Sequence, residues 1–361
     1  MMDLPDTYRR IVIAAEHWFG ATGGGLAHGF RELGWDVVEA DPKDHYIMGR
    51  TAALRLAARV LRKSSTTSYN NALLWGARMS NPLAFLAVKG SYINVESLRK
   101  IKKQGIITAL FYPDVHFDHP GMDLATFDEY DLFFTTKSFH IDYLSKRLGA
   151  DRVRYLPHGY SSLVHRPRYE EMEEANYIAD VLYVGNHSAY KEAWLKEIAG
   201  ALPDIQLMIV GNGWSPDSFP GATVVGRHVL GDGYARLLQS ARINIAVHFG
   251  PTGPDNWEDM VSTRTFQTPA SKGFMLHIDN PEVRSLFDIG TEIDVFSSPG
   301  ELSRKIRHYL DNPEQRARMI EAAYYRAVPA YSYNARAHDI AAAINALAAS
   351  GAPGRTNGPR A

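Results

Sequence analysis

The sequence has no cysteine among its 361 residues, which excludes disulfide bonds, cysteine-ligated zinc and a thiol nucleophile. It also has no apolar run of the roughly 18 residues that a membrane span needs. Its first residues, MMDLPDTYRR, do not show the basic and apolar pattern of a signal peptide. The net charge is -1 and the pI is about 6.9, so no overall field attracts nucleic acid. We therefore expect a cytoplasmic protein that binds no nucleic acid.

The motifs of several common α/β enzymes are absent as well. The sequence has no G-x-x-x-x-G-K-[ST], no G-x-S-x-G after a predicted strand and no H-E-x-x-H, which argues against P-loop NTPases, α/β-hydrolases and zinc proteases. Gly23 and Gly25 begin a G-x-G-x-x-G pattern, but its third position is His28. A dinucleotide-binding site of the dehydrogenase type is therefore not expected.

Short apolar strands alternate with helices along both halves of the chain. In the first half the pattern predicts strands at 10–18, 35–41, 83–90, 106–114, 130–137 and 153–159, and helices at 26–34, 95–105 and 138–149. After a charged segment the same rhythm restarts, with strands at 179–186, 205–213, 243–250 and 273–276, and helices at 189–202, 233–241, 299–327 and 333–349. A further helix is predicted to begin near Arg264.

This alternation predicts two domains, each with a doubly wound parallel sheet. We expect an N-terminal domain at 1–165, a linker at 166–178, a C-terminal domain at 179–332 and a disordered tail at 350–361. Ligands of such sheets bind beyond the carboxyl ends of the strands. The loops after strands, and the crevice expected between the domains, are therefore the places to look for a site.

The segment STRTFQTPASKGFML, residues 262–276, carries a resemblance to a known family. Residues 264–276 resemble the motif Arg-Thr-Phe-Glu-Ile-Pro-Ala-Cys-Gly-Gly-Phe-Met-Leu of the CgeB-like glycosyltransferases, which are relatives of glycosyltransferase family 4. Residues 283–323 are similar to the C-terminal pattern of that family. The resemblance is strong over roughly 180–330 and loose over the N-terminal domain.

The resemblance implies an α/β protein of GT-B fold, in which two Rossmann-like αβα domains face each other across a cleft. It also implies that helix 333–349 crosses back to the first domain. The activity implied is transfer of a sugar from a nucleotide sugar, such as a UDP-sugar, to a hydroxyl of a glycan, a lipid-linked glycan, a protein or a small molecule. The resemblance also implies that the sugar keeps its anomeric configuration and that no cofactor takes part.

Two positions depart from the family pattern. Gln267 stands where relatives have the glutamate that binds the donor ribose, and Lys272 stands where they have a glycine. Asp259, eight residues before Gln267, occupies the position of the first acid in the Glu-x7-Glu pair of the family, and we take it as a catalytic candidate. A glutamine cannot offer the two charge-assisted acceptor bonds of a carboxylate.

Candidate donor-binding residues gather in the C-terminal domain. A departing diphosphate needs Arg, Lys or helix amides to meet its charge. Arg264 opens a predicted helix, although it could also form a surface ion pair with Asp259 or Glu258. Lys191 follows the first strand of the domain in a loop that faces the diphosphate in relatives, although it could be a solvated helix residue. The set is completed by Asn186, His187, Gly211, Gln267 and Ser271.

Candidates in the N-terminal domain flank two predicted strands. Gly23, Gly24 and Gly25 would let a phosphate or sugar approach the backbone, or would simply form a tight turn. Asp114 and His116, in the stretch YPDVHFDHP, suit general-base work on an acceptor hydroxyl. The same stretch could instead bind a metal ion, but its spacing is weak evidence for one.

A basic helix bears on where the acceptor lies. Arg55, Arg59 and Arg62 share one helical face, which could rest on the anionic inner face of a membrane or be merely solvated.

Two other functions stay open. One is a nucleotide-sugar epimerase of the same architecture, and the other is a catalytically silent nucleotide-sugar-binding protein, which Gln267 suggests.

Overall fold

The computed structural model describes residues 9–47, 51–170, 172–251 and 256–351. The chain divides into two compact units, one formed by residues up to Pro157 together with those from Tyr333 onward, and the other by His158–Ser332. The boundary therefore falls before residue 165, and the predicted linker at 166–178 belongs to the second unit. Residues 352–361, most of the tail expected to be disordered, lie outside the described residues.

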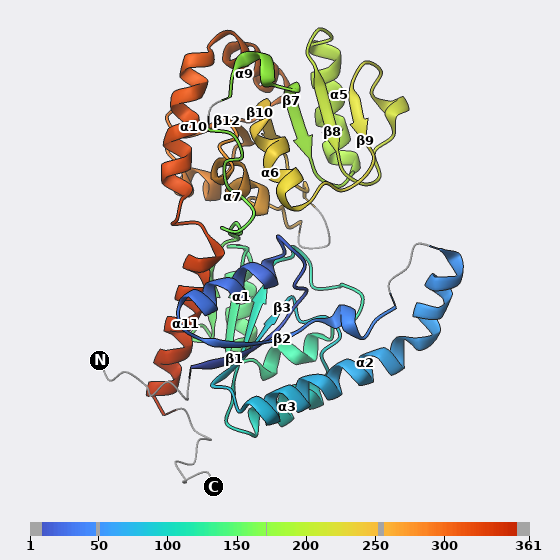
Figure 1. Ribbon diagram of the computed structural model, residues 1–361, viewed down its shortest axis with the longest axis vertical. Helices are drawn as coiled ribbons and strands as arrows, with labels where there is room; N and C mark the ends of the chain where they lie inside the picture. Colours follow the sequence, from blue (N-terminus) through green and yellow to red (C-terminus); the bar gives the residue numbers. More distant parts are fainter. Residues whose placement is uncertain (1–8, 48–50, 171, 252–255, 352–361) are drawn as a thin grey trace. The chain divides into compact units, whose positions relative to one another are not determined.

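The sheet of the first unit contains parallel strands in the order β2-β1-β3-β4-β5-β6 (Figure 1). They are β1 (Arg10–Ala14), β2 (Asp36–Ala40), β3 (Ala84–Val88), β4 (Ile107–Tyr112), β5 (Leu132–Thr135) and β6 (Val153–Tyr155). Every residue of β4 and β5 is buried. Such uninterrupted apolar strands are typical of a parallel sheet that is covered by helices on both faces.

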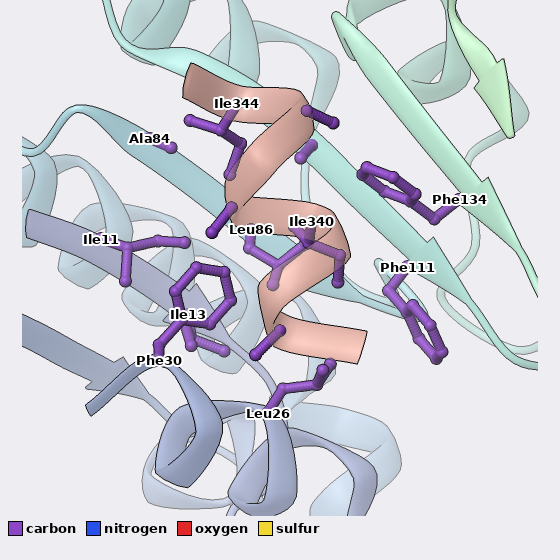
Figure 2. Packing of buried hydrophobic residues seen from close by; sticks show 14 of the residues in the cluster. Ile11, Ile13, Leu26, Phe30, Ala84, Leu86, Phe111, Phe134, Ile340 and Ile344 are labelled. Carbon is purple, nitrogen blue, oxygen red and sulfur yellow. The ribbon is translucent and has the colours of Figure 1, made fainter. Parts of the chain in front are cut away.

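The helices of the first unit are α1 (Thr22–Glu32), α2 (Ala52–Ser80), α3 (Val95–Lys102), α4 (His140–Leu148) and α11 (Tyr333–Ala349). One core lies where α1 and α11 cover the sheet, and Figure 2 shows how it interlocks. Ile340 and Ile344 of α11 extend toward side chains from the strands and from α1, among them Ile11, Ile13, Leu26, Phe30, Ala84 and Leu86.

Helix α1 begins at Thr22, four residues earlier than the sequence predicted, so the run of glycines lies inside its first turns. The reason is close helix packing. A Cβ atom on Gly25 would lie 2.5 Å from the Tyr333 ring, and one on Gly29 would lie 2.8 Å from the Cβ of Ala337. These glycines let α11 approach α1 more closely than any side chain would allow.

The second unit contains parallel strands in the order β12-β11-β10-β7-β8-β9. They are β7 (Ala179–Val184), β8 (Leu207–Val210), β9 (Thr223–Val225), β10 (Ala241–Ala246), β11 (Met275–Ile278) and β12 (Asp294–Phe296). The helices are α5 (Ala189–Ala201), α6 (Gly231–Gln239), α7 (Thr263–Ala270), α8 (Pro281–Leu286), α9 (Pro299–Asp311) and α10 (Pro313–Ala327). Alternate residues of β7 enter different cores, Val181 and Tyr183 on one face and Leu182 on the other, so helices cover both faces.

The helix predicted to begin near Arg264 is confirmed as α7. Ser262 caps it, because its hydroxyl accepts a hydrogen bond from the Arg264 backbone, while Thr265 Oγ1 accepts one from the Ser262 backbone in return. Residues Thr265–Ala270 are all buried. Arg264 is therefore held in the first turn of a short, well-anchored helix.

Candidate functional site

The strand order of the second sheet reverses at one place. The chain runs from β7 outward through β8 and β9 on one side, and then continues from β10 to β12 on the other. Open parallel sheets bind ligands at the carboxyl ends of the strands beside such a reversal. The loops that begin at Gly185, after β7, and at Val247, after β10, are therefore the first candidates for a site.

Arg264 reaches this point from α7. Its Nη1 donates to the carbonyl of Val247 at 3.0 Å, and its guanidinium carbon lies 5.2 Å from the centre of the Tyr183 ring. A Cβ atom on Gly185 would lie 2.8 Å from Arg264 Nη2, so the glycine makes room for the guanidinium. Within the described residues Arg264 forms no ion pair with a carboxylate, which removes the surface ion pair considered from the sequence.

Lys191 lies at the same point and comes from the first turn of α5, where Ser188 is the N-cap. Its side chain is only 2% exposed, so it is not a solvated helix residue. The Nζ atom donates to the carbonyl of Asn186 at 3.1 Å and lies 3.5 Å from the centre of the Phe249 ring. Phe249 lies three residues beyond the end of β10. It was not singled out from the sequence, although its place at the end of a predicted strand could have indicated it.

The charges around Lys191 favour an anion. Burial and the nearby charge of Arg264 lower the pKa of Lys191 to about 7, and the carboxylate of Asp259 only partly opposes this. Asp259 is itself buried, and its backbone N–H donates to the carbonyl of Phe249 at 3.2 Å. Two cationic side chains thus lie close together, and a bound anion would relieve their repulsion.

Gln267 follows Arg264 by one turn of α7 and is 8% exposed. Its side-chain amide makes no hydrogen bond to any residue that the structure describes, so both its donor and its acceptor capacity stay available. Ser271 is different. It is fully buried at the C-cap of α7, about 10 Å along the helix from Arg264 at 1.5 Å per residue. The structure therefore does not bring Ser271 to the two cations.

Three further donor-site candidates of this unit are Asn186, His187 and Gly211. Asn186 is exposed and contributes its carbonyl to Lys191. His187 Nε2 lies 2.5 Å from Glu192 Oε2, and its ring packs on Trp214. A Cβ atom on Gly211 would lie 2.1 Å from the carbonyl oxygen of Gly185. Gly211 thus lets the backbone after β8 pack directly against the backbone after β7, which is a packing role.

A buried histidine supports the start of α7. His277 Nδ1 lies 2.6 Å from the Ile278 carbonyl, and its Nε2 lies 3.0 Å from Thr265 Oγ1 and 2.9 Å from His248 Nε2. Burial lowers the pKa of His277 to about 4, so the ring is neutral at pH 7 and Nε2 can accept a hydrogen bond. Neither histidine was predicted from the sequence to belong to a site.

In the first unit, Asp114 is at the centre of a polar cluster after β4. Its Oδ2 lies 2.7 Å from Lys89 Nζ and 3.1 Å from His119 Nε2. Burial raises the pKa of Asp114, but the hydrogen bonds and charges of His119 and Lys89 outweigh that effect and hold the pKa well below its usual range. Lys89 adopts a left-handed backbone, with φ of 69°, directly after β3. Because ligands of parallel sheets bind at the carboxyl ends of strands, the place of Lys89 at the end of a predicted strand could have indicated it.

The remaining first-unit candidates are placed as follows. His116 lies two residues beyond Asp114, and its carbonyl accepts a hydrogen bond from the Tyr112 hydroxyl. Gly23 and Gly25 are buried in α1, and Gly24 is half-buried there. In the part of the chain that the structure describes, no three His, Asp or Glu side chains are grouped so as to hold a metal ion. The metal-binding alternative for Asp114 to His119 therefore has no such group to support it.

No helix in the described ranges is both long enough and apolar enough to cross a bilayer. Helix α2 has exposed apolar side chains along much of its length, namely Leu54, Leu56, Val60, Leu61, Trp75 and Met79.

Residues 189–342 match the model of a family described as glycosyl transferase-like. This segment runs from the start of α5 into α11 and includes Lys191, Arg264 and Gln267. No curated protein matches the chain.

Solved structures match almost the whole chain at low identity. Sucrose-phosphate synthase from Thermosynechococcus elongatus is 12% identical, with a TM-score of 0.64 over 95% of this chain and 100% of that one. HepE of Anabaena, in complex with UDP, is 10% identical, with a TM-score of 0.58 over 94% and 100%. UDP-GlcNAc 2-epimerase from Neisseria meningitidis, bound to UDP-GlcNAc, is 11% identical, with a TM-score of 0.52 over 93% and 100%. The chain has the GT-B fold. The fold class predicted from the sequence is thereby confirmed.

Proposed function

We propose that this protein is a glycosyltransferase, which moves a sugar from a nucleoside-diphosphate sugar to a hydroxyl of an acceptor. The observation that carries the proposal is the pair of cations, Lys191 and Arg264, at the strand-order reversal of the second sheet. The glycosyl transferase-like match over the same residues supports it. So do two solved proteins of the same fold, one in complex with UDP and the other bound to UDP-GlcNAc.

The proposed chemistry follows from the leaving group. When the bond between the sugar and the diphosphate breaks, negative charge grows on the diphosphate, and groups placed to meet that charge lower the barrier. Lys191 and Arg264 would supply two positive charges, and the amides at the start of α5 would add hydrogen bonds. Because side chains and amides can do this work, we propose a metal-independent transfer. Retention of configuration is proposed from the family resemblance.

We assign proposed roles to two carboxylates. Asp114 is kept ionised by Lys89 and His119, so it could accept the proton or a hydrogen bond of an acceptor hydroxyl. Replacing it with Asn should lower turnover without weakening UDP. Asp259, whose charge acts on Lys191, would orient the donor sugar.

The test has two parts. The protein is incubated with UDP-sugars and hydroxyl acceptors, with and without EDTA, and the products are separated. Sugar attached to an acceptor supports a transferase, an isomerised UDP-sugar supports the epimerase alternative, and neither product, with UDP still bound, supports a silent binding protein. Loss of UDP binding in EDTA would refute the metal-independent proposal.

The second part concerns the cation pair itself. Arg264→Ala should weaken UDP, because hydrogen bonds to charged groups contribute about 1.5–3 kcal/mol. The matched control is Arg307→Ala, which removes an exposed arginine of the same unit that pairs with Asp204. Equal affinities in the two variants would mean that the diphosphate does not lie at Arg264.

We also propose peripheral contact with an anionic membrane surface through α2. Its first half carries Arg55, Arg59, Arg62 and Lys63, and the whole helix has no acidic residue. At about 100° per residue, these cations share one side of the helix. Leu54, Val60, Leu61, Trp75 and Met79 lie on the other side, where Val60 is 71% exposed, and the exposed Leu56 borders the cations. Figure 1 shows the first half of α2 extending away from the sheet of its unit. An apolar stripe on the exposed side of a basic helix is typical of interfacial helices.

A further inference from the structure

Two neighbouring aromatic side chains, Trp18 and Phe19, are exposed on the loop that follows β1. They are 38% and 56% exposed, respectively. Aromatic side chains contribute most when their large apolar surfaces are covered. Two of them left open on one loop therefore indicate a surface that binds something.

The loop lies where a ligand is expected. In the first sheet the strand order reverses at β1, because β2 lies on one side of it and β3 to β6 on the other. Trp18 and Phe19 follow β1 at its carboxyl end. Lys89 and Asp114 follow β3 and β4 at the same edge of this parallel sheet. The aromatic side chains thus share an edge with the carboxylate proposed to act on the acceptor.

The Trp18 ring is held in place before any ligand arrives. Its Nε1 donates to Glu16 Oε2 at 3.0 Å, and Lys43 Nζ lies 3.1 Å from the same oxygen and 5.8 Å from the ring centre. The backbone is fixed as well, since the His17 N–H donates to Asp41 Oδ2 at 2.9 Å. A ring that is already oriented loses little freedom on binding.

The glycines of α1 help to seat this loop. A Cβ atom on Gly23 would lie 2.6 Å from the Glu16 carbonyl oxygen, and one on Gly24 would lie 3.5 Å from that of Trp18. The loop therefore rests directly on the first turn of the helix. The glycine run, which the sequence suggested for phosphate or sugar contact, has this supporting role.

We propose that Trp18 and Phe19 form a stacking surface for a sugar ring of the acceptor, so that the acceptor is a glycan. A pyranose ring has an apolar C–H face that fits an aromatic ring, and a rim of hydroxyls. Glu16 and Lys43 border Trp18, and Asp41 contacts the neighbouring His17, so this loop offers the polar partners that such a rim needs. A saturated lipid chain has an apolar surface but no such rim, so these polar groups favour a sugar over a lipid chain. The inference rests on the proposed transferase function, since it names the class of acceptor for that reaction.

Binding of soluble glycans tests the proposal without turnover. Cellohexaose, maltohexaose and chitohexaose are titrated up to millimolar concentration against the full chain, by calorimetry and by saturation-transfer NMR. At least one should bind, and Trp18→Ala should weaken it about tenfold, equivalent to about 1.4 kcal/mol. Phe19→Ala should also weaken it, and Trp18→Phe, which keeps a ring, should lose less.

The control variant is Tyr325→Ala, which removes an exposed aromatic side chain from α10 in the other unit. It should bind the glycan as the unaltered protein does. UDP affinity, measured on every sample, shows that the variants are folded. Binding of UDP but of none of the three glycans would overturn the inference and leave the transferase proposal standing. Glycan binding through Trp18 without any sugar transfer would support the stacking surface and overturn the transferase proposal. Equal glycan affinity in Trp18→Ala and Tyr325→Ala would also overturn it.

Discussion

The ammonium nitrogen of Lys191 lies 3.5 Å from the centre of the Phe249 ring. The face of an aromatic ring attracts a cation, but the same ring also separates Lys191 from water. Burial and the charge of Arg264 lower the pKa of Lys191 to about 7. Close to neutral pH, therefore, this lysine is charged in only part of the molecules until an anion binds beside it.

The first prediction is that UDP affinity falls as the pH rises from 7 to 9. The ligand needs the charged lysine, and the charged fraction decreases above the lowered pKa of the free protein. A diphosphate raises the pKa of Lys191 again, so binding takes up a proton. The loss is at most about tenfold per pH unit. The terminal phosphate of UDP gains little charge in this range, because its last pKa is near 6.

Two variants isolate the cause. Lys191→Gln should bind UDP more weakly at pH 7 and show little further change up to pH 9. Phe249→Ala should expose Lys191 to water, raise its pKa and move the fall in affinity to higher pH. If Lys191→Gln shows the same pH dependence as the unaltered protein, another group controls the titration.

The second prediction concerns Gln267, whose amide lies free of hydrogen bonds to the described residues. If it binds the donor ribose, Gln267→Ala should lose about 0.5–1.5 kcal/mol of UDP affinity. Gln267→Glu should keep or improve that affinity, because a carboxylate can accept bonds from both ribose hydroxyls. Titration of each variant with UDP measures the effect.

A second ligand makes this test specific to the ribose. With 2′,3′-dideoxy-UDP the difference between Gln267 and Gln267→Ala should disappear, because the hydroxyls that the side chain contacts are gone. Weaker UDP binding by the Glu variant than by the Ala variant would place Gln267 beside the diphosphate instead.

Local patterns in the sequence were enough to predict the α/β class and the helix that carries Arg264. Apolar runs such as those of β4 and β5 are continuous, and the Ser262 cap is local to its helix. The three-residue strands β9 and β12 were not predicted, because a run that short carries little periodicity. The equally short β6 was predicted only as part of the longer run 153–159.

Other features depend on contacts between residues far apart in the chain. The glycines of α1 were predicted to admit a phosphate or sugar or to form a tight turn, whereas Gly25 meets Tyr333, which is about 300 positions away. The same holds for Lys89 and Asp114, and for Lys191 and Phe249, which come together only because parallel strands end at one edge. A single sequence shows the end of each strand but not which strands are neighbours.

The third prediction follows from two glycines in helices of the first unit. A Cβ atom on Gly29 would lie 2.8 Å from the backbone Cα of Asn334, whereas one on Gly76, in α2, would meet nothing within 4 Å. Gly29→Ala should therefore destabilise the protein by about 1–3 kcal/mol, because α11 must shift. Gly76→Ala should stabilise it by about 0.5–1 kcal/mol, since glycine is unfavourable inside a helix. Urea unfolding of both variants gives the comparison, and a stabilising Gly29→Ala would mean that α1 and α11 are not in close contact.

The fourth prediction tests α2 as a membrane-contacting helix. Changing Arg55, Arg59 and Arg62 together to Gln should weaken co-sedimentation with vesicles that contain phosphatidylglycerol. Each cation near such a surface contributes about 1 kcal/mol at moderate salt, so the loss should approach about a hundredfold. A second variant, with Leu56 and Val60 changed to Ser, should also bind less, because it removes two of the exposed apolar side chains and keeps the charge.

The control for α2 changes the same amount of charge elsewhere in the first unit. Lys100, Lys102 and Lys103 of the α3 region are changed to Gln, and two of them already pair with carboxylates, Lys100 with Glu96 and Lys102 with Asp131. Because those charges are locally compensated, this variant should bind vesicles almost as the unaltered protein does. If both triple variants lose binding equally, the attraction comes from net charge alone and α2 has no special part in it. If the unaltered protein does not bind these vesicles even at low salt, the exposed apolar face of α2 faces something other than a membrane.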